Sequence, residues 1–83
     1  MNRDMKVLLI EDHAIVRQGL RRLLEERGVL IVGEAEDGRR GVEMALEMKP
    51  DVVVMDISLP LLGGIDATRK IKKELPDTRI IML

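Results

Sequence analysis

The chain has 83 residues, of which 46% are hydrophobic and 35% charged, and this describes one globular unit near the small end of what folds alone. Fourteen basic and fifteen acidic residues leave a formal net charge of -1, and Phe, Tyr and Trp are absent, so the composition excludes the basic surface and stacking platform of a nucleic-acid binder. Because cysteine is absent and no apolar run approaches a membrane span, we expect a cytoplasmic protein without disulfide bonds or membrane contact.

The first strand pattern is a short apolar run from Lys6 to Ile10, which is typical of a strand buried on both faces. It stops at the acidic pair Glu11 and Asp12. From His13 the apolar residues recur at helical spacing, and this predicts an amphipathic helix that ends at Gly28. The apolar positions of this helix are Val16, Leu20, Leu23 and Leu24.

A second strand is predicted from Val29 to Ala35, followed by a turn over Glu36-Asp37-Gly38. A second helix then ends at Pro50. One face of this helix is marked by Val42, Ala45, Leu46 and Lys49. The run from Asp51 to Met55 repeats the apolar, β-branched design of the first strand and leads directly into Asp56, so we predict a third strand there.

After Asp56 the sequence predicts a loop from Ile57 to Gly64, and Pro60 and Gly64 are expected to shape its backbone path. A third helix, with Thr68, Ile71 and Leu75 on its inner side, is followed by a fourth strand from Arg79 to Leu83. Strict alternation of strands and helices predicts an α/β fold with a parallel, doubly wound sheet. We expect the flavodoxin-like strand order 2-1-3-4.

Carboxylates follow two of these strands. In doubly wound sheets, sites form outside the carboxyl ends of strands where the strand order reverses, and Glu11, Asp12 and Asp56 all stand at such ends. Carboxylates brought together repel one another unless a cation is present. The all-oxygen ligand set favours Mg²⁺ and disfavours zinc. A carboxylate beside Mg²⁺ can attack a phosphoryl group, and Asp56 is the best nucleophile because it stands alone at its strand end.

Simpler interpretations exist for each of these residues. Asp12 can cap the following helix, Glu11 can be a solvated loop residue, and Asp56 can form an Asx turn. Their joint placement at two corresponding strand ends favours a site. We interpret His13, at the helix start, as a surface residue rather than a ligand or base. Ser58 is either an ordinary loop hydroxyl or a residue whose backbone carbonyl faces the ion.

In the order and spacing of these motifs, the chain resembles the receiver domains of bacterial two-component response regulators, specifically the NarL/FixJ group. The stretch from Val7 to Leu24, VLLIEDHAIVRQGLRRLL, is similar to the first strand and helix of that group. The stretch from Pro50 to Gly64, PDVVVMDISLPLLGG, is similar to its phosphoacceptor strand and loop. The resemblance extends over essentially the whole chain and implies a CheY-like fold.

The resemblance implies that Asp56 is the site of phosphorylation. It also implies that Asp12 binds Mg²⁺ directly, Glu11 binds it through water, and Ser58 offers its backbone carbonyl. The phosphoryl donor would be the phosphohistidine of a sensor histidine kinase, or a small donor such as acetyl phosphate. Such a domain is a phosphoacceptor that assists its own phosphorylation rather than an enzyme, and in the intact protein it controls transcription.

In the same family a Ser or Thr follows the fourth strand and a Lys follows the fifth, and both positions fall beyond Leu83. We therefore expect residues 1–83 to be one incomplete receiver domain that binds DNA only through a separate output domain. We expect slow phosphotransfer, because positive charge at the phosphoryl oxygens dominates this chemistry. We also expect self-association through the open edge strand from Arg79 to Leu83.

The sequence supports other functions less well. An aspartyl-phosphate phosphatase type of enzyme would carry a second Asp two residues after the nucleophile, where this chain has Ser58. A nucleotide-binding or FMN-binding unit would need a glycine-rich or phosphate-cradling first loop. The alternative that stays open is a structural or self-assembling fragment of a receiver domain that does not switch.

Overall fold

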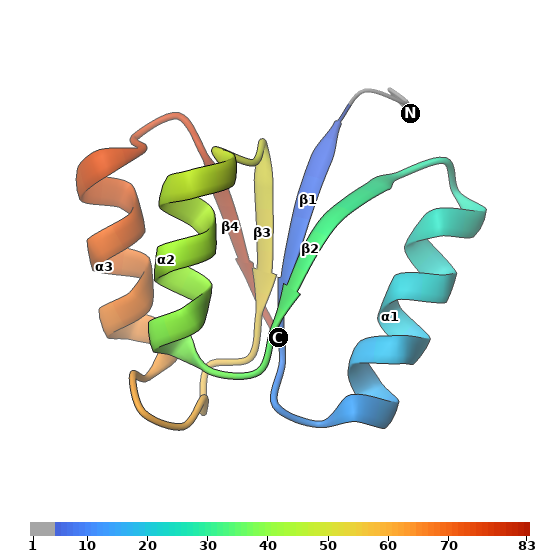
Figure 1. Cartoon of the computed structure of the whole chain (residues 1–83), viewed down its shortest axis with the longest axis horizontal. Coiled ribbons are helices and arrows are strands. Elements are labelled where there is room, and N and C mark those ends of the chain that lie inside the picture. The colour runs from blue at the N-terminus through green and yellow to red at the C-terminus, as the bar shows by residue number, and fades with distance from the viewer. Residues whose placement is uncertain (1–4) are drawn as a thin grey trace.

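The computed structural model describes residues 5–83, which form a parallel sheet with the strand order β2-β1-β3-β4. Helix α1 covers one face of the sheet, whereas α2 and α3 lie side by side on the other (Figure 1). The predicted α/β fold and its strand order 2-1-3-4 are therefore confirmed. The elements in chain order are β1 (Lys6–Ile10), α1 (Ala14–Glu26), β2 (Leu30–Ala35), α2 (Gly38–Met48), β3 (Val52–Met55), α3 (Gly64–Glu74) and β4 (Arg79–Met82).

The main difference from the predicted elements is at the start of α2. Gly38, which we placed in a turn, is the first residue of this helix. The helix begins early because the side chain of Asp37 caps it, accepting a hydrogen bond of 2.7 Å from the backbone N–H of Arg40. A capping Asp satisfies one of the free N–H groups of the first turn and stabilises the helix by about 1 kcal/mol.

Strand β1 divides the hydrophobic core into two clusters. Leu8 and Ile10 point toward α2 and α3, whereas Val7 and Leu9 point toward α1. All four are at most 3% exposed, which confirms a strand buried on both faces. At about 1.5–3 kcal/mol for each fully buried aliphatic side chain, these residues are a large part of what holds the sheet to its helices.

The α1 face is less completely covered than the α2–α3 face. Leu20 and Leu24 pack on the sheet as predicted, but Val16 and Leu23 remain 46% and 51% exposed. A groove of about 280 Å³ lies beside α1. Its lining residues are Met5, Val7, Leu24, Val29, Val52, Val54, Arg79 and Ile81. Only half of the predicted apolar stripe of α1 is therefore buried. Within residues 5–83, no second helix lies beside α1 on this face of the sheet to cover the rest.

The pairing of β1 with β3 decides where the acidic residues meet. Ile10 pairs with Met55 in parallel register, and the backbone N–H of Asp56 donates to the carbonyl of Ile10 at 3.1 Å. The residues that follow β1 and β3 therefore leave the sheet at the same end, where the carboxyl ends of the two strands lie side by side. Within the described range, no helix has the length and apolar character needed to cross a membrane.

Candidate functional site

Glu11 is anchored at the end of β1 by backbone contacts on two sides. Its N–H donates to the carbonyl of Ala35 at 3.0 Å, and its own carbonyl accepts from the guanidinium of Arg17 at 2.7 Å. Arg17 in turn donates to the carboxylate of Glu34 on β2 at 2.9 Å. Because Glu11 is only 4% exposed, the interpretation of it as a solvated loop residue is wrong.

Asp56 is held at the end of β3 by Ser58. One carboxylate oxygen of Asp56, Oδ1, accepts from the backbone N–H of Ser58 at 3.0 Å and from its hydroxyl at 3.1 Å. The backbone hydrogen bond is the main reason that the pKa of Asp56 lies below its ordinary value; burial opposes this and the hydroxyl adds to it. The Asx-turn geometry is thus present, but neither of these bonds uses the second oxygen, Oδ2.

His13 lies closer to the carboxylates than the sequence suggested. Its Nδ1 is 3.1 Å from Oε1 of Glu11 and 3.2 Å from Oδ1 of Asp12. Its pKa is raised above the ordinary value, mainly by the hydrogen bond with Glu11 and then by the charges of Asp12 and Glu11. The ring is 67% exposed, so its surface position is confirmed. His13 occupies the N-cap position of α1 without making a capping bond, so the alternative that Asp12 caps this helix is wrong.

Together these side chains form what we call the acidic cluster. One ligand atom from each of its members lies within 4.8 Å of the others, and the members are Glu11, Asp12, His13 and Asp56. Within the described residues, Oε2 of Glu11 is buried without any hydrogen-bond partner. A buried carboxylate oxygen without a partner is costly, and a bound cation would supply the missing interaction. The acidic cluster therefore fits a divalent metal ion.

The loop after Asp56 is shaped by close backbone contacts. The N–H of Gly64 donates to the carbonyl of Ile57 at 2.9 Å, and a Cβ at this position would lie 2.7 Å from the Cα of Ile57. On the other side of the loop, a Cβ on Gly38 would overlap the backbone carbonyl of Leu62. Two glycines from α2 and α3 thus let the loop lie close to both helices.

Sequence reasoning brought Glu11, Asp12 and Asp56 together correctly but missed two residues. The position of His13 at a helix start favours a surface residue, whereas its place directly after the acidic pair is the signal that it belongs to the cluster. The sequence pattern does not single out Arg17 of α1, because one of its partners, Glu34, lies on β2. The role of the Ser58 backbone carbonyl as a metal ligand stays a prediction; the N–H and hydroxyl of Ser58 donate to Asp56.

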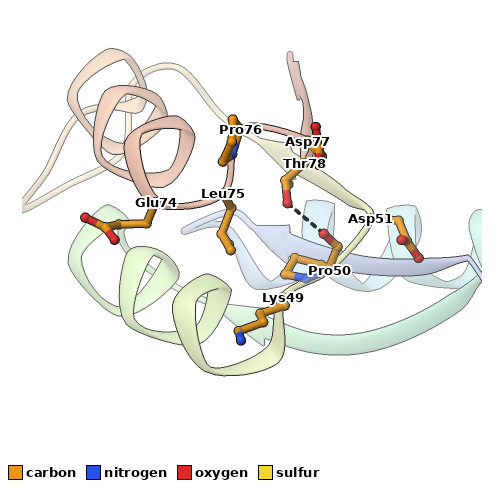
Figure 2. Close-up of a pocket in the computed structure, with 8 residues that line it drawn as sticks. All are labelled: Lys49, Pro50, Asp51, Glu74, Leu75, Pro76, Asp77 and Thr78. Carbon is orange, nitrogen blue, oxygen red and sulfur yellow. Dashed lines mark hydrogen bonds between the residues drawn. The ribbon is translucent and has the colours of Figure 1, made fainter.

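A separate pocket of about 330 Å³ lies at the opposite end of the sheet (Figure 2). It is lined by Lys49, Pro50, Asp51, Glu74, Leu75, Pro76, Asp77 and Thr78. The hydroxyl of Thr78 donates to the carbonyl of Pro50 at 2.9 Å and thereby ties the start of β4 to the start of β3. None of the predicted site residues lines this pocket, so it is separate from the acidic cluster.

A comparison with protein families matches residues 7–83 to the response regulator receiver domain. Among curated relatives, the response regulator UvrY of Escherichia coli is 48% identical over 80 residues. The transcriptional regulatory protein LiaR of Bacillus subtilis is 46% identical, also over 80 residues. Each alignment covers 95% of this chain but only 37% and 38% of the respective relative, so the chain spans just over a third of their length.

Solved structures agree with this assignment. A LuxR-family two-component response regulator from Aurantimonas superposes with a TM-score of 0.88 at 45% identity, over 93% of this chain and 56% of the other. A chain of the CheX-CheY-BeF3-Mg²⁺ complex from Borrelia burgdorferi gives a TM-score of 0.91 at 26% identity, over 94% of this chain and 60% of the other. The chain belongs to the response regulator receiver domain family, as its resemblance to the NarL/FixJ group implied.

Proposed function

We propose that Asp56 is the phosphoacceptor of this receiver domain. The observation that carries the proposal is the position of Asp56 at the end of β3, in a cluster with Glu11 and Asp12. Receiver domains are signalling domains rather than enzymes, so the phosphorylated Asp56 would be the signal itself. Phosphorylation would add negative charge and acceptor oxygens at the carboxyl ends of β1 and β3 and alter how the loops there pack.

The side chains of the cluster suit this transfer. Asp56 stays ionised because hydrogen bonds from Ser58 keep its pKa low, and Oδ2 is left available for attack because those bonds hold Oδ1. Attack by Oδ2 on the phosphorus forms an O–P bond while the P–N bond of a phosphohistidine donor breaks. The electron pair of that bond remains on the donor's imidazole nitrogen.

The metal ion in this proposal is Mg²⁺, which would supply positive charge beside the phosphoryl oxygens. Glu11, Asp12, Asp56 and the backbone carbonyl of Ser58 would hold it. Two observations support this: the unpaired buried oxygen of Glu11, and a solved relative that was crystallised as a CheX-CheY-BeF3-Mg²⁺ complex. Arg17 holds the backbone of Glu11 in place by donating to its carbonyl oxygen at 2.7 Å.

The partner in this proposal is a sensor histidine kinase, the usual source of phosphohistidine in two-component systems. One relative is a transcriptional regulatory protein, so we propose that the intact protein controls transcription. The formal net charge of -1 and the lack of aromatic residues argue that DNA contacts are made by another domain.

Incubation with Mg²⁺ and acetyl phosphate, followed by intact mass measurement, tests the proposal. We expect one phosphoryl adduct on the unmodified chain and none on the Asp56→Asn variant. Asp51→Asn is the matched control, because Asp51 is an exposed carboxylate at the opposite end of the same strand. An adduct that survives Asp56→Asn but disappears in Asp51→Asn would overturn the assignment. The rate of adduct formation tests the expectation of slow transfer.

We also propose that the chain associates with a second copy through β4. This strand is one of the two edge strands of the sheet, with β2 at the other edge, and Ile81 on β4 is 51% exposed. An open strand edge presents unpaired N–H and C=O groups that a neighbouring strand can use. The groove beside α1, which Ile81 also lines, would add apolar contact area. This supports the alternative of a self-assembling fragment that does not switch.

A further inference from the structure

The acidic cluster contains a nitrogen ligand that the proposed Mg²⁺ site does not use. His13 directs Nδ1 toward two carboxylates, at 3.1 Å from Glu11 and 3.2 Å from Asp12. An imidazole nitrogen is a poor partner for Mg²⁺, which prefers oxygen, but a good one for the later first-row dications. Any metal preference that depends on an imidazole must come from His13, because it is the only histidine of the chain.

The spacing of these atoms matches neighbouring ligands on one ion. Metal–ligand bonds of about 2.1 Å place adjacent octahedral ligands about 3.0 Å apart, and a tetrahedral arrangement about 3.4 Å apart. The two distances from Nδ1 of His13, 3.1 Å and 3.2 Å, fall between these values. An ion at the centre would replace the present contacts between the ring and the two carboxylates.

The buried oxygen of Glu11 gives an independent reason to expect a cation here. The side chain of Glu11 is 6% exposed, and Oε2 has no hydrogen-bond partner among the described residues. The other oxygen, Oε1, is the one that contacts His13. Glu11 therefore faces the cluster with one oxygen beside the imidazole and a second oxygen still unpaired.

We propose that His13 is a direct metal ligand and that, with Glu11, Asp12 and Asp56, it forms a site for a transition-metal dication that competes with Mg²⁺. The inference rests on the proposed metal site for its three carboxylates and adds the fourth ligand. His13 needs little rearrangement to take this role, because its exposed ring makes no helix-capping bond. A transition-metal ion held by His13 would then occupy the same place as Mg²⁺.

Calorimetric titration of the untagged chain with Co²⁺, Ni²⁺ and Mg²⁺ tests the inference, together with the visible absorption of bound Co²⁺. We expect Co²⁺ and Ni²⁺ to bind more tightly than Mg²⁺. The His13→Ala variant should lose at least about tenfold of the Co²⁺-over-Mg²⁺ preference, or about 1.4 kcal/mol, and the Co²⁺ spectrum should change as the nitrogen ligand is lost. His13→Gln, which keeps a polar side chain without the imidazole, should behave like His13→Ala.

The outcomes separate this inference from the proposed function. A preference and a Co²⁺ spectrum that are unchanged in both His13 variants would overturn the role of His13, even if Asp56 is phosphorylated. A preference that falls in both variants would support it, even if no phosphoryl adduct forms. The control is Asp56→Asn, which should weaken Co²⁺ and Mg²⁺ together, because it removes a ligand common to both.

Discussion

Glu34 on β2 holds the basic side of α1 to the sheet. Its carboxylate receives hydrogen bonds from Arg17 and Arg21. Burial alone would raise the pKa of Glu34, but these two guanidinium groups outweigh it, so that the pKa lies below its ordinary value of 4.5. Since Arg17 also grips the carbonyl of Glu11, Glu34 indirectly supports the acidic cluster.

We expect Glu34→Gln to lower the free energy of unfolding by about 1–2 kcal/mol at neutral pH, because two charge-assisted hydrogen bonds are lost. A carboxyl whose pKa is lowered by folding stabilises the protein above its unfolded pKa and loses this effect as pH falls through the folded pKa. The gap between the two proteins should therefore shrink below about pH 4.5. Urea unfolding followed by circular dichroism across this range measures it.

The matched control for this prediction is Glu36→Gln. Glu36 is 3.7 Å from Arg17 but 78% exposed, so its removal should change stability by less than about 0.5 kcal/mol. Equal losses in Glu34→Gln and Glu36→Gln would contradict the idea that the half-buried contacts of Glu34 carry the stabilisation.

At the scale of elements, the start of α2 is pressed against the loop that follows Asp56. A Cβ added to Gly38 would overlap the carbonyl of Leu62. We expect Gly38→Ala to destabilise the fold by about 1–3 kcal/mol, because either the loop or the helix must move. Gly19→Ala is its counterpart in α1, where the added Cβ meets nothing within 4 Å. That change should stabilise by about 0.5–1 kcal/mol.

Thermal unfolding of the two alanine variants checks the opposite signs. If Gly38→Ala proved as stable as Gly19→Ala, the loop would not be held against α2 as described. Because alanine is favoured over glycine in helices, a loss of stability in Gly38→Ala reports the contact with Leu62 rather than helix propensity.

The elements themselves were largely predictable, because their signals are local. The apolar β-branched run of β3 and the amphipathic patterns of the helices are each formed by residues close together in sequence. The convergence of Glu11 with Asp56 followed from the strand order. The contact of Gly38 with Leu62 was not predictable, since residues distant in sequence meet there. The approach of His13 to Glu11 depends on a side-chain rotation that sequence pattern does not determine.

For the whole molecule, the proposal that copies associate through the edge of β4 can be tested by placing a charge there. We expect Ile81→Lys to raise the dissociation constant of the self-associated form at least about tenfold, because a charge on an edge strand opposes pairing. Sedimentation velocity over a range of concentrations measures this. Ile15→Lys is the control, since Ile15 is 85% exposed on α1 and lies outside the edge.

Two results would count against association through this edge. One is a chain that stays monomeric at every concentration before any substitution. The other is an equal effect of Ile81→Lys and Ile15→Lys, which would indicate that added charge alone, rather than its place on β4, controls assembly.

The hydrogen bond between Thr78 and Pro50 lies at the start of β3, whereas the acidic cluster lies at the end of this strand. The four residues of β3, at about 3.3 Å each, put roughly 13 Å between the start and the end of this strand. Asp77 is exposed beside this bond (Figure 2), and the chain has no cysteine. A single thiol introduced as Asp77→Cys would thus carry a fluorescent label at a place where the label does not obstruct the acidic cluster.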